Sequence, residues 1–280
     1  MSGMRAQRRR DRTVRVLLLV AALGIFVLPL VWTALAALGV QANNSSSPPS
    51  FHGPPTLDHF SEVGLAEPSF WQELFTSTAA AACAAVLAVA AALLTAYGLA
   101  RSRFAGDRLI IQWFLVLASL PAMAYVIPLS DLMRRAHLID TFAGVVLTEA
   151  AVTTPLAIYV LYGALVQLST EWEEAAWLDG ASIFSVIRRV VLPLVGPTMG
   201  ATAIILFVLD WNLLLVPLVL TAGGLKTVPV AMIDFFTFER ELEWPTAAAA
   251  LIISLLPVAI LVAVFHRVLD RFALNVAPAD

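Results

Sequence analysis

The chain has 280 residues, of which 60% are hydrophobic and only 13% are charged. Soluble globular proteins have about 45–50% apolar and about 25% charged residues, so this composition excludes a protein that faces water throughout. A single cysteine, Cys83, excludes internal disulfides and metal sites built on cysteine pairs. The formal net charge of −3 is small, and we expect no nucleic-acid partner.

The apolar residues fall in six blocks, each long enough to cross a bilayer, which requires about 20 residues. The blocks lie at 14–39, 75–100, 109–132, 142–168, 196–221 and 245–268. We therefore predict an all-α membrane protein with six transmembrane helices. Its domain covers residues 14–268, between a basic segment at 1–13 and a tail at 269–280, and residues 41–70 form a loop. A cleaved signal peptide is the alternative for 14–39, although its apolar part would run only about 7–15 residues.

Lys and Arg residues predict the orientation, because they are enriched in cytoplasmic loops. The two termini and the loops on their side contain thirteen, against four on the other side. Both termini and the polar segment 169–189 are therefore expected in the cytoplasm. Arg134 and Arg135 are exceptions to this rule, since they lie on the predicted external side.

The polar segment 169–193 has clear local signals. Thr170 with Glu173 three residues later matches a capping box at a helix start. Gly180 is placed to end that helix in a left-handed conformation. Ser182 can cap a second short helix, which must end near Pro193. An interfacial amphipathic helix that merely joins two spans is the alternative interpretation.

A spaced set of residues lies in this segment, namely Glu174-Ala175-Ala176, Gly180, Val190 and Leu192-Pro193. The spacing resembles the EAA loop of ABC importer permeases, in which Ile usually stands at the position of Val190. In that family the loop forms the coupling helix, which sits in a cleft of the cytoplasmic ATPase and passes on its closing motion. The resemblance implies these docking residues: Glu174, Ala175, Ala176, Asp179, Gly180, Leu192 and Pro193.

Further stretches resemble the second permease of maltose-type sugar importers; they lie at 55–60, 96–101, 104–106, 210–212, 217–221 and 243–248. The resemblance implies a type I ABC importer (MetI-like) permease fold in the bacterial plasma (inner) membrane. It also implies a heterodimer with a second, related permease, two ATP-binding cassette subunits that hold ATP and Mg, and an extracytoplasmic solute-binding protein, all in contact with membrane lipid. Residues 273–280 depart from the family pattern.

Two acids fall inside predicted spans, where charge is costly and usually faces a polar cavity or a partner. Glu149 lies in the fourth span and Asp210 near the middle of the fifth. The candidate translocation path comprises Asp210, Trp211, Asn212, Glu149, Thr153 and Thr154. For Glu149, a helix–helix hydrogen bond or a carboxylate wetted at the interface is the alternative.

The chain lacks the phosphate-binding pattern G-x-x-x-x-G-K-[ST], since residues 223–227 (GGLKT) have the wrong spacing. It also lacks HExxH and a nucleophile elbow. We therefore expect a permease rather than an enzyme, with no metal or cofactor bound by this chain. A stand-alone secondary transporter or channel is one alternative, and it often shows an internal repeat. A membrane enzyme or assembly factor is the other, and it requires a catalytic constellation.

Overall fold

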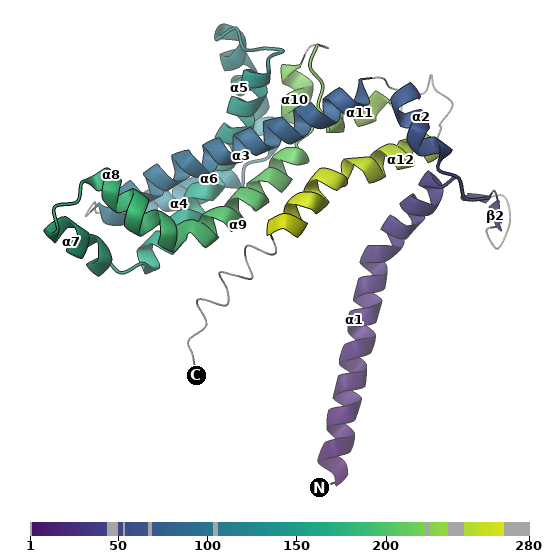
Figure 1. The fold of residues 1–280 in the computed structure, drawn as a ribbon, viewed down its shortest axis with the longest axis horizontal. Coiled ribbons are helices and arrows are strands. Elements are labelled where there is room, and N and C mark those ends of the chain that lie inside the picture. Colours follow the sequence, from purple (N-terminus) through teal and green to yellow (C-terminus); the bar gives the residue numbers. More distant parts are fainter. Residues whose placement is uncertain are drawn as a thin grey trace. The chain divides into compact units, whose positions relative to one another are not determined.

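A computed structural model of the chain describes residues 2–43, 50–52, 54–66, 69–102, 106–221, 224–234 and 244–265. The regular elements among these residues are helices, apart from one pair of short strands (Figure 1). They form two compact units, one of residues 1–70 with 234–255 and one of residues 71–233 with 256–280. The predicted tail at 269–280 and part of the predicted loop at 222–245 lie outside the described residues.

The first unit contains α1 (Ser2–Ala37), β1 (Gln41–Asn43), β2 (Ser50–His52), α2 (Asp58–Ala66) and α12 (Trp244–Ser254). The helix α12 contacts both α1 and α2, and the Thr246 hydroxyl donates to Oε2 of Glu62 at 3.1 Å. The prediction of a plain loop at 41–70 is therefore wrong. Its residues form an antiparallel strand pair and a helix, and the Thr56 hydroxyl accepts a hydrogen bond from the Asp58 amide at 3.1 Å at the start of that helix.

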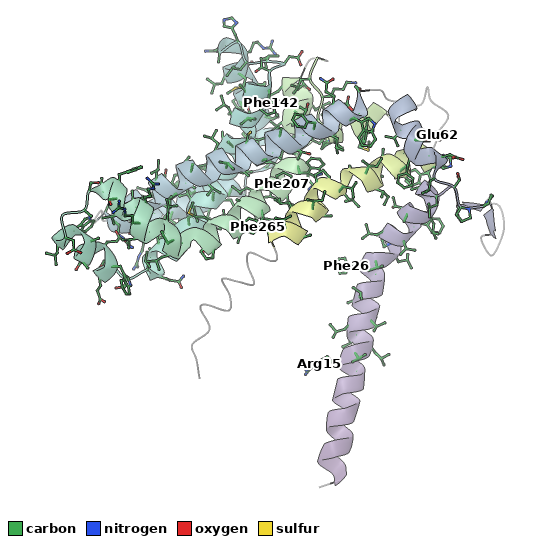
Figure 2. The ribbon with its side chains drawn as sticks, in the orientation of Figure 1. Arg15, Phe26, Glu62, Phe142, Phe207 and Phe265 are labelled. Atoms are coloured by element: carbon green, nitrogen blue, oxygen red, sulfur yellow. The ribbon has the colours of Figure 1, made fainter. Side chains whose placement is uncertain are left out.

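The helix α1 exposes apolar side chains on all its faces between residues 14 and 31. Phe26, labelled in Figure 2, is 77% exposed. Exposure of an apolar surface of this extent to water is energetically unfavourable, whereas lipid or another subunit can cover it. This surface agrees with the prediction that 14–39 is a membrane span.

The second unit contains α3 to α11. Their bounds are α3 Phe70–Arg101, α4 Asp107–Ala118, α5 Ala122–Arg135, α6 Phe142–Gln167, α7 Glu171–Leu178, α8 Ile183–Val186, the π-helix η1 Ile187–Val191, α9 Leu192–Trp211, α10 Leu215–Leu220 and α11 Val228–Asp234. The helix α6 contacts α4, α9 and α10. The core also contains an alanine stripe of α3, Ala84, Ala88, Ala92 and Ala96, all fully buried. Such small residues allow membrane helices to approach closely.

The third predicted span is not a continuous helix. Among the described residues, five helices are long and apolar enough to cross a membrane, and a sixth span arises there only if α4 and α5 count as one, bent by 93°. Pro121 precedes α5 in an extended conformation, and a proline disfavours helical geometry at the residue before it. The prediction of one helix over 109–132 is therefore wrong, although six spans remain when the bent pair is counted.

The fifth predicted span begins earlier and ends earlier than 196–221. Its helix runs over Ile183–Trp211, and α10 follows as a separate short helix. The expected helix end near Pro193 is wrong because η1 changes the hydrogen-bond register just before the proline. There the amide of Leu192 donates to the Ile187 carbonyl, five residues back, and a π-turn of this kind accommodates a residue that lacks an N–H.

The segment 223–227, whose sequence superficially matches a phosphate-binding loop, binds a carboxylate of the same chain through residues 224 and 225. The amides of Gly224 and Leu225 donate to the two carboxylate oxygens of Asp140 at 3.1 and 3.0 Å. The Asp140 amide donates to the Leu220 carbonyl at 2.9 Å. These three bonds tie the turn before α6 to the end of α10 and to the segment after it.

Replacing Gly144 with Ala should destabilise the second unit. A Cβ at Gly144 would meet the backbone carbonyl of Leu138, and that backbone cannot yield as a flexible side chain would. Overpacking of this kind costs about 1–3 kcal/mol, so the melting temperature of the detergent-purified protein should fall. Gly163→Ala in the same helix is the matched control, because its Cβ would meet open space. Equal melting temperatures for the two variants would contradict this packing.

Candidate coupling loop and buried acids

The helices α7 and α8 leave most of their side chains exposed. Within the predicted docking set, Glu174, Ala175, Asp179 and Gly180 are exposed and Ala176 is half-buried. Large apolar side chains are exposed beside them: Trp172, Trp177, Leu178, Ile183 and Phe184. We call residues 172–184 the α7–α8 surface. Exposed apolar side chains rimmed by charged groups are typical of a surface that contacts another protein or a membrane.

Gly180 ends α7 as predicted. Its φ of +78° lies in the left-handed region, which favours glycine because a Cβ would be strained there. The Ala181 amide donates to the Ala176 carbonyl at 3.0 Å, and the Gly180 amide donates to the Trp177 carbonyl at 2.9 Å. These two bonds form a Schellman motif, which fixes the turn between α7 and α8.

The two predicted helix starts have different outcomes. Ser182 caps α8 as expected, since its hydroxyl accepts from the Ser185 amide at 3.4 Å. The capping box at Thr170 is wrong, because that residue is helical and its side chain makes no capping bond. The Ser169 hydroxyl instead accepts from the Glu171 amide at 3.3 Å. The side chain of Glu173, the expected partner of Thr170, is bound elsewhere.

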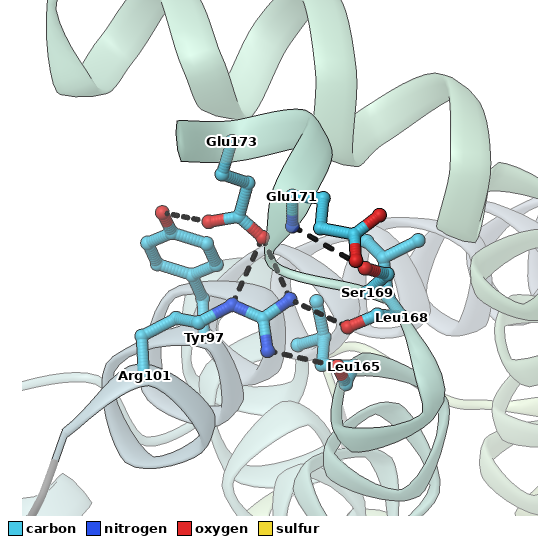
Figure 3. Close-up of polar contacts among 7 residues, drawn as sticks. All are labelled: Tyr97, Arg101, Leu165, Leu168, Ser169, Glu171 and Glu173. Carbon is cyan, nitrogen blue, oxygen red and sulfur yellow. Dashed lines mark hydrogen bonds and ion pairs between the residues drawn. The ribbon is translucent and has the colours of Figure 1, made fainter. Parts of the chain in front are cut away.

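Glu173 is fully buried and is held by two side chains of α3 (Figure 3). Its Oε1 accepts from Nε and Nη2 of Arg101 at 2.9 and 2.6 Å. Its Oε2 accepts from the Tyr97 hydroxyl at 2.8 Å. A buried carboxylate requires such partners, because an unpaired charge in a low dielectric is strongly unfavourable.

Sequence reasoning assigned no role to Arg101 and Tyr97 in this loop. Their spacing of four residues places them on one face of α3, and this was the only local signal available. Their partner Glu173 lies 72 and 76 positions away in the chain. Among the glutamates at 171, 173 and 174, nothing local distinguishes the buried one from the other two.

Leu192 and Pro193, the last two predicted docking residues, do not belong to the α7–α8 surface. Both lie in the first turn of α9, beyond η1. Leu192 is half-buried and packs against the core, whereas Pro193 is exposed. Their position favours a role in starting α9 after the π-turn.

Glu149 and Asp210 are both 2% exposed, and they come from the neighbouring helices α6 and α9. The two carboxyl groups lie close enough to interact electrostatically. Oε2 of Glu149 and both side-chain oxygens of Asp210 have no donor within hydrogen-bonding distance in the described part of the chain. Both acids are thus buried without a basic partner among those residues.

The other residues of the predicted path surround these acids unevenly. The Thr153 hydroxyl lies beside Asp210, but it donates to the Glu149 carbonyl at 3.1 Å. The Thr154 hydroxyl donates to the Ala150 carbonyl at 2.6 Å. Trp211 is buried and stacks on Phe207, with ring centroids 6.0 Å apart. Asn212 is exposed, and its side-chain Nδ2 donates to the Val208 carbonyl at 2.7 Å.

The long apolar helices define a polytopic membrane protein. The architecture is similar to that of a solved bacterial ABC transporter chain involved in the import of the acidic polysaccharide alginate. The TM-score is 0.73 at 19% identity, and the match covers 92% of this chain and 96% of the other. This likeness confirms the predicted importer-permease fold.

Residues 88–274 match the family described as binding-protein-dependent transport system inner membrane component, and the chain belongs to that family. It is therefore a multi-pass subunit of the bacterial plasma membrane and a permease rather than an enzyme, as predicted.

Several relatives cover most of the chain. The trehalose transport system permease protein SugB of Mycobacterium tuberculosis is 36% identical over 65% of this chain and 67% of its own length. The trehalose/maltose transport system permease protein MalG of Thermococcus litoralis is 27% identical over 92% and 95% of the two chains. The diacetylchitobiose uptake system permease protein DasC of Streptomyces coelicolor is 29% identical over 86% and 87%.

Substitutions at Gly180 should loosen α7 in the order Asn, then Ala, then Val. Asn tolerates a positive φ, Ala is strained there by about 1 kcal/mol or more, and a β-branched residue is strained further. Hydrogen–deuterium exchange of the peptide 171–182 should become faster in the same order. Identical exchange for all three variants would show that the positive φ does not limit the stability of this turn.

Proposed function

We propose that this permease serves an importer of a sugar or sugar-like solute. Three relatives that align over most of their length are permeases for trehalose, trehalose/maltose and diacetylchitobiose. The sugar-type stretches of the sequence, such as 210–212 and 217–221, support the same solute class. Which sugar is carried depends on contacts of the whole transporter, including a second permease subunit.

The α7–α8 surface is the proposed docking site for the ATPase. The observation that carries this proposal is the exposure of Glu174 and Ala175 beside large apolar side chains, on a helix whose opposite face is anchored by Glu173. A firmly anchored helix can transmit a displacement, whereas a loosely held one would absorb it. Two ATPase subunits would hold ATP and Mg, and one would bind this chain on the cytoplasmic side.

The proposed cycle is alternating access. A solute-binding protein delivers the sugar from outside, and closure of the ATPase pair on ATP pushes on the α7–α8 surface. This displacement opens the cavity between this chain and a second, related permease to the outside, and ATP hydrolysis returns the transporter to its starting conformation. Both termini lie in the cytoplasm in this arrangement, which agrees with the distribution of Lys and Arg.

Glu149, Asp210 and the polar groups near them are the proposed contribution of this chain to the translocation path. Carboxylate oxygens accept hydrogen bonds from sugar hydroxyls, and three of the four oxygens of this pair lack a donor in the described part of the chain. The candidate set remains Asp210, Trp211, Asn212, Glu149, Thr153 and Thr154. The buried position of the acids supports a path opened by helix movement rather than a standing pore.

A stand-alone secondary transporter is the second candidate, and only the buried acids favour it, because ion-coupled transporters use such groups. Family membership argues against it. Transport that persists without any ATPase subunit would favour this candidate, whereas complete dependence on the ATPase would exclude it.

Replacing Glu174 with Lys should abolish association with the ATPase. The change reverses an exposed charge at the centre of the proposed docking surface, so a complementary partner would repel it. Co-purification of the ATPase with a tagged permease, after co-expression of the transporter subunits, measures the effect. Glu171→Lys is the matched control, since it makes the same charge change at an exposed position of the same helix. Equal ATPase recovery for both variants would contradict the proposed surface.

Replacing Asp210 with Asn should reduce the initial uptake rate without loss of the ATPase. A hydrogen bond to a charged group contributes about 1.5–3 kcal/mol, so we expect uptake to fall roughly ten- to a hundredfold. Uptake of the sugar that supports growth through this transporter is measured in cells. Asp131→Asn, at an exposed position in α5, should leave uptake unchanged. Unaltered uptake in the Asp210 variant would remove this residue from the path.

A further inference from the structure

Arg101, the last residue of α3, connects three elements at one point (Figure 3). In addition to the Oε1 atom of Glu173, its guanidinium binds the end of α6. Nη1 donates to the Leu165 carbonyl at 3.1 Å and Nη2 donates to the Leu168 carbonyl at 3.3 Å. The charge also suits its position, because a helix C-terminus attracts cations. One side chain thus joins α3, the last turn of α6, and α7.

Both side chains of this ion pair, Arg101 and Glu173, are held in fixed orientations. The side chain of Glu173 is fully buried and that of Arg101 is 13% exposed, so little water competes for their hydrogen bonds. A guanidinium presents its donors in a planar fork, which gives its contacts a fixed direction. Tyr97 holds the second carboxylate oxygen, and Glu173 therefore cannot rotate away from Arg101 without breaking several bonds at once.

Glu173 is also the one fully buried side chain among the eight residues of α7. The helix α7 also contacts α8 and η1, which follow it in the chain, and Ala176 packs against the core only in part. A displacement of α7 can therefore reach α3 through the carboxylate of Glu173, whereas the end of α6 is also joined to α7 by residues 168–170 of the chain.

We propose that Tyr97, Arg101 and Glu173 form a latch that transmits the movement of α7 into α3 and α6. The latch rests on the proposed docking of the ATPase, and it adds the route by which the push leaves the coupling helix. Its three members are positioning residues, since none of them lies on the exposed face offered to the ATPase. A latch that only stabilised the resting fold would leave the response to nucleotide unchanged when replaced by apolar groups.

The test compares nucleotide responses in the complete transporter in nanodiscs, which requires no solute. The latch variant is Tyr97→Phe with Arg101→Met and Glu173→Met, because well-packed apolar groups can replace a buried ion pair without loss of folding. Tyr162→Phe is the matched control. It removes another tyrosine–carboxylate bond, to Asp107 at 3.1 Å, which involves α4 and α6 but not α7.

Hydrogen–deuterium exchange is measured with and without ATP and vanadate in peptides covering 97–102, 163–168 and 171–178. In the wild type and in Tyr162→Phe, all three peptides should respond to nucleotide. In the latch variant, 171–178 should still respond, while the response of 97–102 should fall about tenfold or more. The response of 163–168 should fall less, because residues 168–170 still join α6 to α7. If the latch variant fails to assemble, Glu173→Gln, which keeps the side-chain shape, is compared in the same way.

An unchanged response of 97–102 in the variant would overturn the latch and leave ATPase docking intact. Absence of any response in the wild-type peptide 171–178 would overturn the docking proposal, and the latch with it. Failure of the docking proposal therefore appears in peptide 171–178 of the wild type, and failure of the latch appears in peptide 97–102 of the variant.

Discussion

The ion pair between Arg101 and Glu173 determines which face of α7 is available to other proteins. Successive residues of an α-helix point about 100° apart. Because Glu173 is directed into the core, Glu174 and Ala175 must turn outward, as observed. The Schellman turn at Gly180 then fixes where α8 begins. The position of the proposed docking surface thus follows from one buried carboxylate and the guanidinium that neutralises it.

The membrane explains why the spans could be predicted from the sequence but their breaks could not. A bilayer demands long apolar runs, and such runs are visible in any sequence. Proline is a weak guide in these runs, because membrane helices tolerate it where neighbouring groups satisfy the freed carbonyl. Pro128 and Pro155 lie inside α5 and α6, whereas Pro121 marks the bend between α4 and α5. Whether a proline lies inside a helix or at a bend depends on how the neighbouring helices pack against it, which the sequence pattern does not reveal.

The candidate site shows the same division between local and distant causes. Gly180 and Ser182 act through bonds to residues three to five positions away, so their roles could be predicted. The role of Glu173 was predicted wrongly, because a partner in α3 outcompeted the local capping bond. Glu149 was correctly expected inside a span, but Asp210 lies in the last turn of α9 rather than near the middle of a span, and the burial of both acids depends on the packing of α6 against α9. One sequence alone contains no signal for such a pairing.

Site-directed cross-linking tests the central claim, that α7 binds the ATPase, most directly. Ala175→Cys in a Cys83→Ser background places a single thiol on the exposed face of α7, and Leu194→Cys places one on an exposed position of α9 as the control. The complete transporter is treated with a short thiol-to-amine cross-linker. The account predicts a covalent product between the Ala175→Cys permease and the ATPase, and a much weaker one from the control. Equal products from both positions, or none from Ala175→Cys, would contradict it.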